Sequence, residues 1–550
     1  MGLEKNAKIK RPVKKQLLLL LPFAFCYAFF IVLGDWQGSA AYSNAQNVGR
    51  LVLWAAVSFG VLLAAGFLLE NGARVARRVG EENLPYSIRM FPEKRPRQGG
   101  LRIWFLFFSL CLLCYLPYFL VYYPTWLNND AVWQMEQALG HAAKSNHHPY
   151  FHTLIIKFFL TAGYGLFHDY TAAVALYTFF QMALTAVVFG FFLYLLYRRG
   201  TRVLWLVLAA LFYALLPVNG IYSICMGKDA WFTAFFLLFM WVVSVCAAGR
   251  QAAGRLWVLF FVTGLSVCLL RSNGIFIFAG TAFFLLLSQF RRRREMGGAF
   301  RRRMCLSAAA VLLCYVLWQG PVLSLLGVEP PDTIEGLTMP VQHLLCAYVR
   351  GGDLTDEEVA MIDAVAPLSH VDEFYNPYLF DITKNYIREN GNQNIIAENK
   401  GAYAKLWLRV GLRNPMQYLE AQIRQTAGYY ALHIPHEQML YSEYFMVDNP
   451  FGIENARKVF SYDAGLAMGE FLQWFQKIYN SVWSLGANTW LLLFAMACAL
   501  YRGRSCLVYV PCLMLLGSLF LAAPVYNEFR YAYGVFAALP FLLASSFGKE

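Results

Sequence analysis

The sequence predicts an all-α membrane protein with about twelve transmembrane helices and one mostly α-helical domain outside the membrane. The residue types AVILMFWYC make up 59% of the 550 residues and charged residues only 14%, whereas soluble domains carry about 25% charged residues. The apolar residues form blocks of about 16 to 25 residues, the length that crosses ~30 Å of hydrocarbon. Backbone groups in lipid need partners within the protein, so these blocks are expected to be helices.

The apolar blocks alternate with polar loops, and we interpret them as twelve spans. They cover residues 16–34, 51–69, 103–121, 170–196, 203–218, 229–248, 256–270, 275–290, 304–325, 484–500, 506–523 and 532–547. Basic clusters lie at Lys5–Lys15, Arg74–Arg102, Arg198–Arg202, Arg291–Arg294 and Arg301–Arg303. Short basic loops mark the cytoplasmic side, and an even number of spans returns the chain to that side. We therefore expect both termini in the cytoplasm.

The basic residues in these short cytoplasmic loops account for much of the net charge of +13, so the charge does not indicate a nucleic-acid partner. Most of the twelve cysteines lie inside apolar blocks, and the sequence has no CxxC pair outside a span. Neither a disulfide framework nor cysteine chemistry is expected. The first apolar block has a poor cleavage site for a signal peptide, so we interpret it as a retained helix.

Residues 150–168 are apolar enough to span, but a span here would move every later basic loop to the external side. We therefore predict an interfacial or re-entrant helix for this block.

The chain is expected to have four parts. Residues 1–102 hold the tail, two N-terminal helices and a basic loop, and 103–325 form a transmembrane core whose external loop is 122–169. Residues 326–483 are rich in polar side chains and long enough for a domain of their own, and 484–550 hold the last helices. Thr355, followed by Glu358, predicts a helix start inside the external domain.

The external loop carries the first group of candidate site residues, in Asn128-Asn129-Asp130. A helix that starts here places Asp130, Gln134, Gln137 and His141 on one face. A carboxylate beside amides suits a general base that also binds sugar hydroxyls. The alternative is that Asp130 only caps the helix.

A histidine group follows, with His147, His148 and His152 close to Pro149. The i, i+4 spacing of His148 and His152 permits a divalent metal, although no HExxH motif and no third ligand is present. Hydrogen bonding to phosphate or sugar is the second interpretation. The third is that these histidines only cap and pack a helix at the interface.

Three further groups lie at external helix ends, where polar side chains are costly unless they have a purpose. They are Lys228-Asp229, the turn that holds Arg271 and Asn273, and the segment with Glu528, Arg530 and Tyr531. Arg271 is expected to bind a lipid phosphate through its guanidinium. The alternatives are snorkelling anchors for Lys228-Asp229, a headgroup contact for Arg271, and a structural ion pair of Arg530 with Glu528 or Asp229.

The chain resembles the GT-C superfamily of integral membrane glycosyltransferases, which includes protein O-mannosyltransferases, aminoarabinose transferases and RgtA-like enzymes. It is most similar to a bacterial branch of that superfamily, which places it in the bacterial cell membrane. The resemblance lies in YYPTWLNNDAVWQMEQALG, NHHPYFHTLIIKFF, LRSNGIFIF and NEFRYAYGVFAALP, and in EGLTMPVQHLLCAYV and YNPYLFDITKNYIREN of the external domain.

The resemblance implies that Asp130 is a base or metal ligand and that Arg271 lies near a polyprenyl phosphate. The family's HPP-like element corresponds to His148-Pro149-Tyr150, which lacks the second proline. A polyprenyl-phosphate sugar would be the donor, and a glycan, lipid or protein outside the cytoplasm the acceptor. The family suggests no role for the two N-terminal helices.

The expected function is an inverting glycosyl transfer in which Asp130 deprotonates the acceptor and Arg271, with Lys228 or Arg530, balances the leaving phosphate. The other residues expected to bind substrate are Asn129, Gln134, Gln137, His147, His148, His152, Asp229, Asn273, Glu528 and Tyr531. A transporter or lipid flippase is one alternative. A polysaccharide polymerase or ligase that uses diphosphate-linked donors is another.

Overall fold

The computed structural model describes residues 13–36, 44–78, 100–248, 254–291, 298–434, 448–454, 462–522 and 525–547. Every secondary-structure element in these ranges is helical, and the only β contacts are isolated bridges. The predicted tail before residue 13 and most of the basic loop at 79–99 lie outside the described residues.

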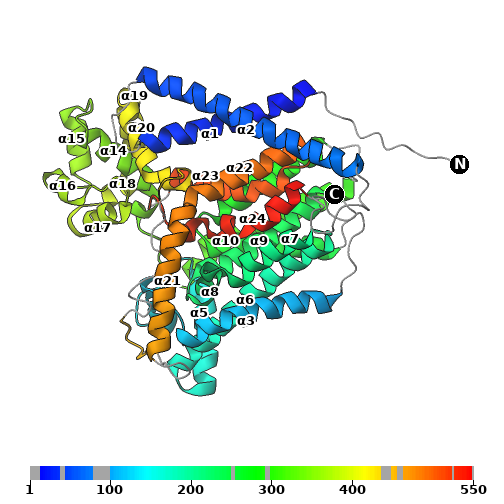
Figure 1. Ribbon diagram of the computed structural model, residues 1–550. Helices are drawn as coiled ribbons and strands as arrows, with labels where there is room; N and C mark the ends of the chain where they lie inside the picture. The colour runs from blue at the N-terminus through cyan, green and yellow to red at the C-terminus, as the bar shows by residue number, and fades with distance from the viewer. Residues whose placement is uncertain are drawn as a thin grey trace.

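A bundle of apolar helices forms most of the molecule (Figure 1). Its helices are α1 (Val13–Trp36), α2 (Asn44–Arg78), α3 (Leu101–Val121), α6 (Tyr170–Arg198), α7 (Val203–Ala210), η1 (Leu211–Leu215), α8 (Pro217–Ile224), α9 (Lys228–Ala247), α10 (Gly254–Leu270), α11 (Gly274–Arg291), α12 (Gly298–Leu317), α22 (Leu485–Tyr501), η6 (Leu507–Tyr509), α23 (Val510–Ala522) and α24 (Phe529–Phe547). Short segments η2 (Trp318–Val322) and α13 (Leu323–Leu325) extend α12. An aromatic-rich core between α6, α9 and α24 holds them together, with Phe192 and Phe236 fully buried.

A helix covers each of the twelve apolar blocks, but the count of twelve spans is not confirmed. Among the described residues, seven helices are long and apolar enough to cross a membrane, or nine if two bent pairs each count as one span. The block at 203–218 bends by 41° before Pro217, because proline has no N–H to continue the helix and clashes with the preceding turn. Gly254–Leu270 and Leu507–Ala522 are apolar but shorter. The coarser prediction, an all-helical protein with several apolar helices that could span a membrane, is confirmed.

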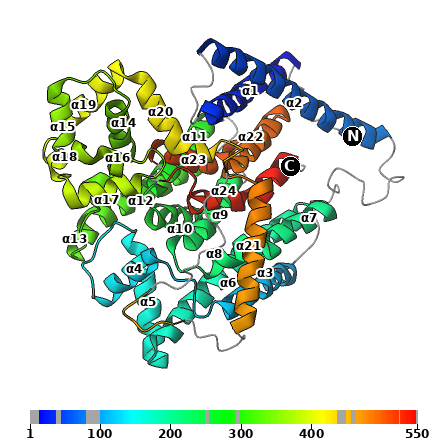
Figure 2. The same ribbon diagram turned by 60° about the vertical axis from the view of Figure 1, so that its left-hand side comes forward.

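A separate helical lobe lies at one end of the bundle (Figure 1, Figure 2). It holds η3 (Thr333–Leu337), α14 (Thr338–Val349), α15 (Asp356–Asp363), η4 (Leu368–His370), α16 (Val371–Phe374), α17 (Phe380–Asn390), α18 (Asn394–Glu398), α19 (Lys400–Arg413) and α20 (Pro415–Thr426), followed by η5 (Ala427–Tyr429). Its own apolar core includes Ile334 and Val410. Helix α15 begins after Thr355, where the sequence predicted a helix start, and Thr355 and Glu358 form a capping box there. The start of α1 and the end of α24 both lie at the opposite end of the bundle (Figure 1).

Three helices lie outside both the bundle and the lobe. Helices α4 (Asn129–Leu139) and α5 (Tyr150–Phe167) pack on each other and α5 packs on α6, while α21 (Tyr462–Val482) contacts α3. Helix α5 covers the block that we predicted to be interfacial, and it is not among the helices that pass as spans. Its side chains Phe158, Leu166 and Phe167 are exposed, as an interfacial helix requires.

Candidate functional site

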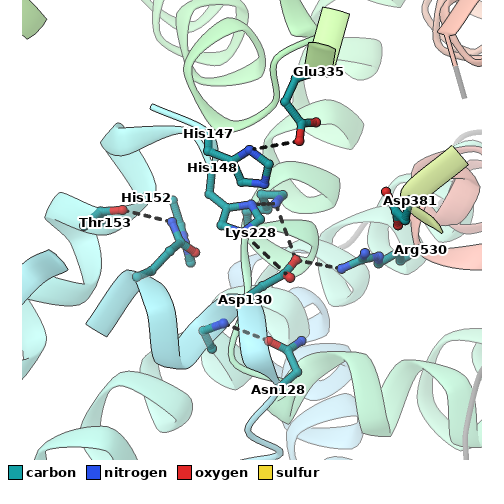
Figure 3. A network of polar contacts seen from close by, with 12 residues as sticks. Asn128, Asp130, His147, His148, His152, Thr153, Lys228, Glu335, Asp381 and Arg530 are labelled. Carbon is teal, nitrogen blue, oxygen red and sulfur yellow. Dashed lines mark hydrogen bonds and ion pairs between the residues drawn. The ribbon is translucent and has the colours of Figure 1, made fainter. Parts of the chain in front are cut away.

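Asp130 is the centre of a charged cluster where several helix ends meet (Figure 3). Its Oδ2 accepts a hydrogen bond from Arg530 Nη1 at 2.8 Å, across 400 residues of sequence. The ammonium of Lys228 lies 3.8 Å from the same oxygen, and His148 Nε2 lies 3.7 Å from Oδ1. About a third of the Asp130 and Arg530 side chains remains exposed, 33% and 30%. The carboxylate is therefore paired and still accessible.

Lys228 and His148 form the second part of the cluster. Lys228 Nζ lies 2.8 Å from His148 Nδ1. Burial, followed by the charge of Lys228, lowers the pKa of His148 to about 2. His148 is thus neutral, and because its Nδ1 accepts from Lys228, its proton sits on Nε2 and faces Asp130.

Arg271 joins the cluster through Asp229 and the chain of Arg530. Its Nη1 donates to Asp229 Oδ1 at 2.9 Å and to the Arg530 carbonyl at 3.3 Å. Its guanidinium lies 5.1 Å from the ring centre of Tyr531. Glu528 lies 3.3 Å from Arg530 Nε. The carboxylates of Asp130, Asp229 and Glu528 therefore balance the cations of Lys228, Arg271 and Arg530. Arg530 forms the predicted ion pair with Glu528 and also pairs with Asp130.

The backbone holds these side chains through helix starts. Asn128 caps α4 by accepting from Ala131 N, and the residue before it, Leu127, is fully buried. Trp126 N donates to Ile224 O and Met226 N to Trp126 O, which ties the entry to α4 to the entry to α9. Asn273 Nδ2 donates to Ser518 of α23 at 2.7 Å, so it anchors the turn after Arg271.

The pKa of Asp130 follows from these neighbours. Burial raises the pKa of the carboxyl, but the surrounding charges, Lys228 first and Arg530 next, outweigh burial and hold it well below its ordinary value. Asp130 is therefore ionised throughout the physiological range.

The lobe contributes residues that the sequence did not single out. Glu335 Oε1 lies 3.3 Å from His147 Nδ1 and 3.0 Å from Lys384 Nζ, and it accepts a hydrogen bond from Arg388 at 2.5 Å. Asp381 pairs with Lys384 at 2.7 Å and lies beside Arg530 in Figure 3. The sequence did contain a pattern that indicates three of these residues. The spacing of Asp381, Lys384 and Arg388 places them on one face of a helix, which is α17.

Several predicted site residues do not reach Asp130. Gln134 of α4 and His152 of α5 are buried between the two helices, where Gln134 Oε1 lies 3.0 Å from His152 Nδ1, and Tyr177 OH lies 2.8 Å from His152 Nε2. Gln137 is also buried and accepts from Ser145 N. Asn129 is exposed. Asp130, Gln134 and Gln137 follow one another along α4 as their spacing predicts, but the two buried amides contact α5 and the following loop and not the charged cluster.

Metal binding was an open interpretation of the histidines. The described ranges contain no group of three or more His, Cys, Asp or Glu side chains that could hold a metal ion. Around Asp130 the neighbours are cations and a neutral histidine, and a cation site there would first have to displace Arg530 and Lys228.

One family model matches the chain, over residues 139–549, and its description is a family of unknown function, DUF6020. No curated protein and no solved structure matches the chain. The matched region contains Lys228, Arg271 and Arg530, and it begins after Asp130. Because it covers well over half of the 550 residues, the chain belongs to the DUF6020 family.

Proposed function

We propose that this multi-pass protein is a glycosyltransferase that moves a sugar from a polyprenyl-phosphate donor to an acceptor on the side of the membrane that carries the α14–α20 lobe. The observation that carries the proposal is one accessible carboxylate, Asp130, paired with Arg530 and Lys228 at helix ends, with Arg271 joined to the same cluster through Asp229. Transfer of a sugar from a phosphate needs both a base and cations for the leaving group. The resemblance to GT-C enzymes supports the same reaction, in the bacterial cell membrane with both termini cytoplasmic.

In the proposed reaction the acceptor hydroxyl attacks the anomeric carbon from the face opposite the phosphate. A C–O bond to the acceptor forms, the C–O bond to the phosphate breaks, and its electron pair stays on the phosphate oxygen. Asp130 takes the hydroxyl proton. Arg530 and Lys228, with Arg271 behind them, balance the additional negative charge on the leaving phosphate. The anomeric centre is inverted in this single displacement.

Donor binding would also prepare the base. The cations that lower the pKa of Asp130 are the groups that would turn to the phosphate. Once they share their charge with the donor, burial dominates and the pKa of Asp130 rises toward a value at which it accepts a proton readily. The cluster is balanced in charge before the donor arrives, so this exchange of partners is the step that the proposal requires.

A transporter or lipid flippase is the second candidate, because α7, η1 and α8 form a bent helix pair. Broken helices of this kind often line transport sites. The charged groups, however, gather at the helix ends that face the lobe, which suits a reaction at the membrane surface better than passage through the midplane.

The test uses the full chain in nanodiscs and polyprenyl-phosphate hexoses and pentoses labelled in the sugar. We expect Asp130→Asn to lower transfer by at least about 100-fold, the usual contribution of a general base. Asp169→Asn is the matched control, because Asp169 caps α6 and asparagine caps equally well.

Two results would contradict the proposal. An unchanged rate for a folded Asp130→Asn chain removes Asp130 from the mechanism. Movement of the labelled lipid across a bilayer, without a new glycosidic bond, would establish transport instead.

A further inference from the structure

Helix α21 has three distinct faces, each a stripe of four residues. The inward stripe packs on the bundle and is buried or half-buried: Met468, Leu472, Phe475 and Tyr479. A second stripe is apolar and exposed: Phe471, Trp474, Ile478 and Val482. The third is polar and exposed: Glu470, Gln473, Lys477 and Ser481.

The stripes follow one another around the helix. Each has nearly the same spacing and is shifted from the next by one residue, which is about 100° around an α-helix. The apolar stripe therefore lies between the inward stripe and the polar one. This order suits a helix that lies at a membrane surface against a transmembrane bundle. Its inward stripe contacts protein, its apolar stripe contacts lipid and its polar stripe contacts water.

The length of the segment excludes one straight span. Helices α21 (21 residues) and α22 (17 residues) would together be about 57 Å long, nearly twice the ~30 Å of hydrocarbon. The chain instead bends by 50° between Val482 and Leu485. Helix α21 then runs across the direction of the bundle helices, at the end that carries the lobe (Figure 1, Figure 2).

We propose that α21 lies in the surface of the lipid bilayer on the side of the lobe, with its apolar stripe in the acyl-chain region and its polar stripe in water. The occupant of this face is lipid because α21 is joined to the apolar helix α22 by only two residues, Trp483 and Ser484, and cannot leave the membrane surface. The four apolar side chains are 42 to 74% exposed in the protein alone, and lipid then covers their exposed surface. The proposal does not depend on the proposed reaction.

Fluorescence quenching of Trp474 tests the proposal in the full chain reconstituted in phosphatidylcholine vesicles. Brominated phosphatidylcholine quenches tryptophans in the acyl region, and acrylamide quenches those in water. We expect Trp474→Phe to lose part of the lipid-quenched fluorescence and none of the acrylamide-quenched part. The matched variant Trp474→Phe with Gln473→Trp moves the ring to the polar stripe, so the acrylamide-quenched part should rise.

Each other outcome overturns the placement. If Trp474→Phe removes acrylamide-quenched fluorescence, the stripe faces water. If the lost fluorescence is quenched by neither reagent, the stripe is covered by protein, such as a second copy of the chain. Both variants change exposed side chains, so circular dichroism is expected to show an unchanged helix content.

Discussion

At the scale of single residues, the most informative feature is that Asp130 shares its charge with partners from distant helices. Arg530 and Lys228 hold it ionised, and the neutral ring of His148 lies 3.7 Å from its second oxygen. A carboxylate that only capped α4 would need none of these partners, and Asn128 already supplies the cap. The arrangement therefore favours a chemical role over the capping interpretation.

His152 is a second residue whose environment has a measurable consequence. It is fully buried between Gln134 and Tyr177, and burial lowers its pKa to about 3. An unfolded histidine titrates near pH 6.5. Between these values the unfolded chain binds a proton that the folded chain does not, so the free energy of unfolding falls as the pH falls.

We predict that His152→Gln reduces this dependence on pH. The wild-type free energy of unfolding should fall below about pH 6.5, and His152 should account for up to ~1.4 kcal/mol per pH unit of that fall. The measurement is denaturant unfolding in one detergent between pH 7.5 and 5. Exposed His370 provides the control His370→Gln, which should leave the slope as in the wild type. An equal slope in His152→Gln would show that His152 is charged in the folded chain.

At the scale of elements, the site depends on the corner where α4, α5 and α6 meet. Gly163 of α5 faces the backbone of α6, where an added Cβ would lie 2.6 Å from Ala173 Cα. Gly165, two residues on, faces open space. The close approach of α5 and α6 keeps His152 of α5 in contact with Tyr177 of α6, and His152 in turn contacts Gln134 of α4.

The two glycines make a matched pair. We predict that Gly163→Ala lowers the free energy of unfolding by about 1–3 kcal/mol, because the new methyl group meets backbone that cannot move aside. Gly165→Ala should leave stability unchanged or raise it by up to ~1 kcal/mol, because alanine favours the helix. Thermal unfolding of the two variants in the same detergent gives the comparison. Equal changes in the stability of the two variants would contradict the close contact between α5 and α6 at Gly163.

At the scale of the whole molecule, the lobe and the segment that leads into it, residues 326–332, contact both chain segments that carry the site. Near α4, Asn146 N donates to Glu329 O and Glu329 N to Lys144 O. Near α24, Tyr526 N donates to Tyr378 O at 3.0 Å. Glu335 adds a side-chain contact to the first of these segments, because it is the shared partner of His147, Lys384 and Arg388.

We predict that Glu335→Gln weakens the contact between the lobe and the loop that contains His147. His147 loses its carboxylate, while Lys384 keeps Asp381 and Arg388 keeps Asp332. A loss of about 1–2 kcal/mol of local stability corresponds to roughly 10-fold faster amide exchange. Hydrogen exchange of a peptide that covers residues 144–149 measures the effect. Glu357→Gln, an exposed change in α15, is the control, and the same exchange in both variants would show that Glu335 does not hold the loop.

Local pattern and charge determined much of this protein from the sequence. Apolar blocks predicted the helices, and the cost of charge near lipid marked Asp130, Lys228, Arg271 and Arg530 as candidates. These four side chains do meet in one cluster. The helix start predicted near Thr355 was equally local and is confirmed.

Only the tertiary structure decided which partners those charges have. It paired Asp130 with Arg530, buried Gln134 and His152 between α4 and α5, and brought Glu335 into the site from the lobe. It also bent two of the apolar segments, and among the described residues seven helices, or nine if each bent pair counts as one span, are long and apolar enough to cross a membrane. Helical periodicity acts over a few residues, whereas a contact across 400 residues depends on how all the helices pack together.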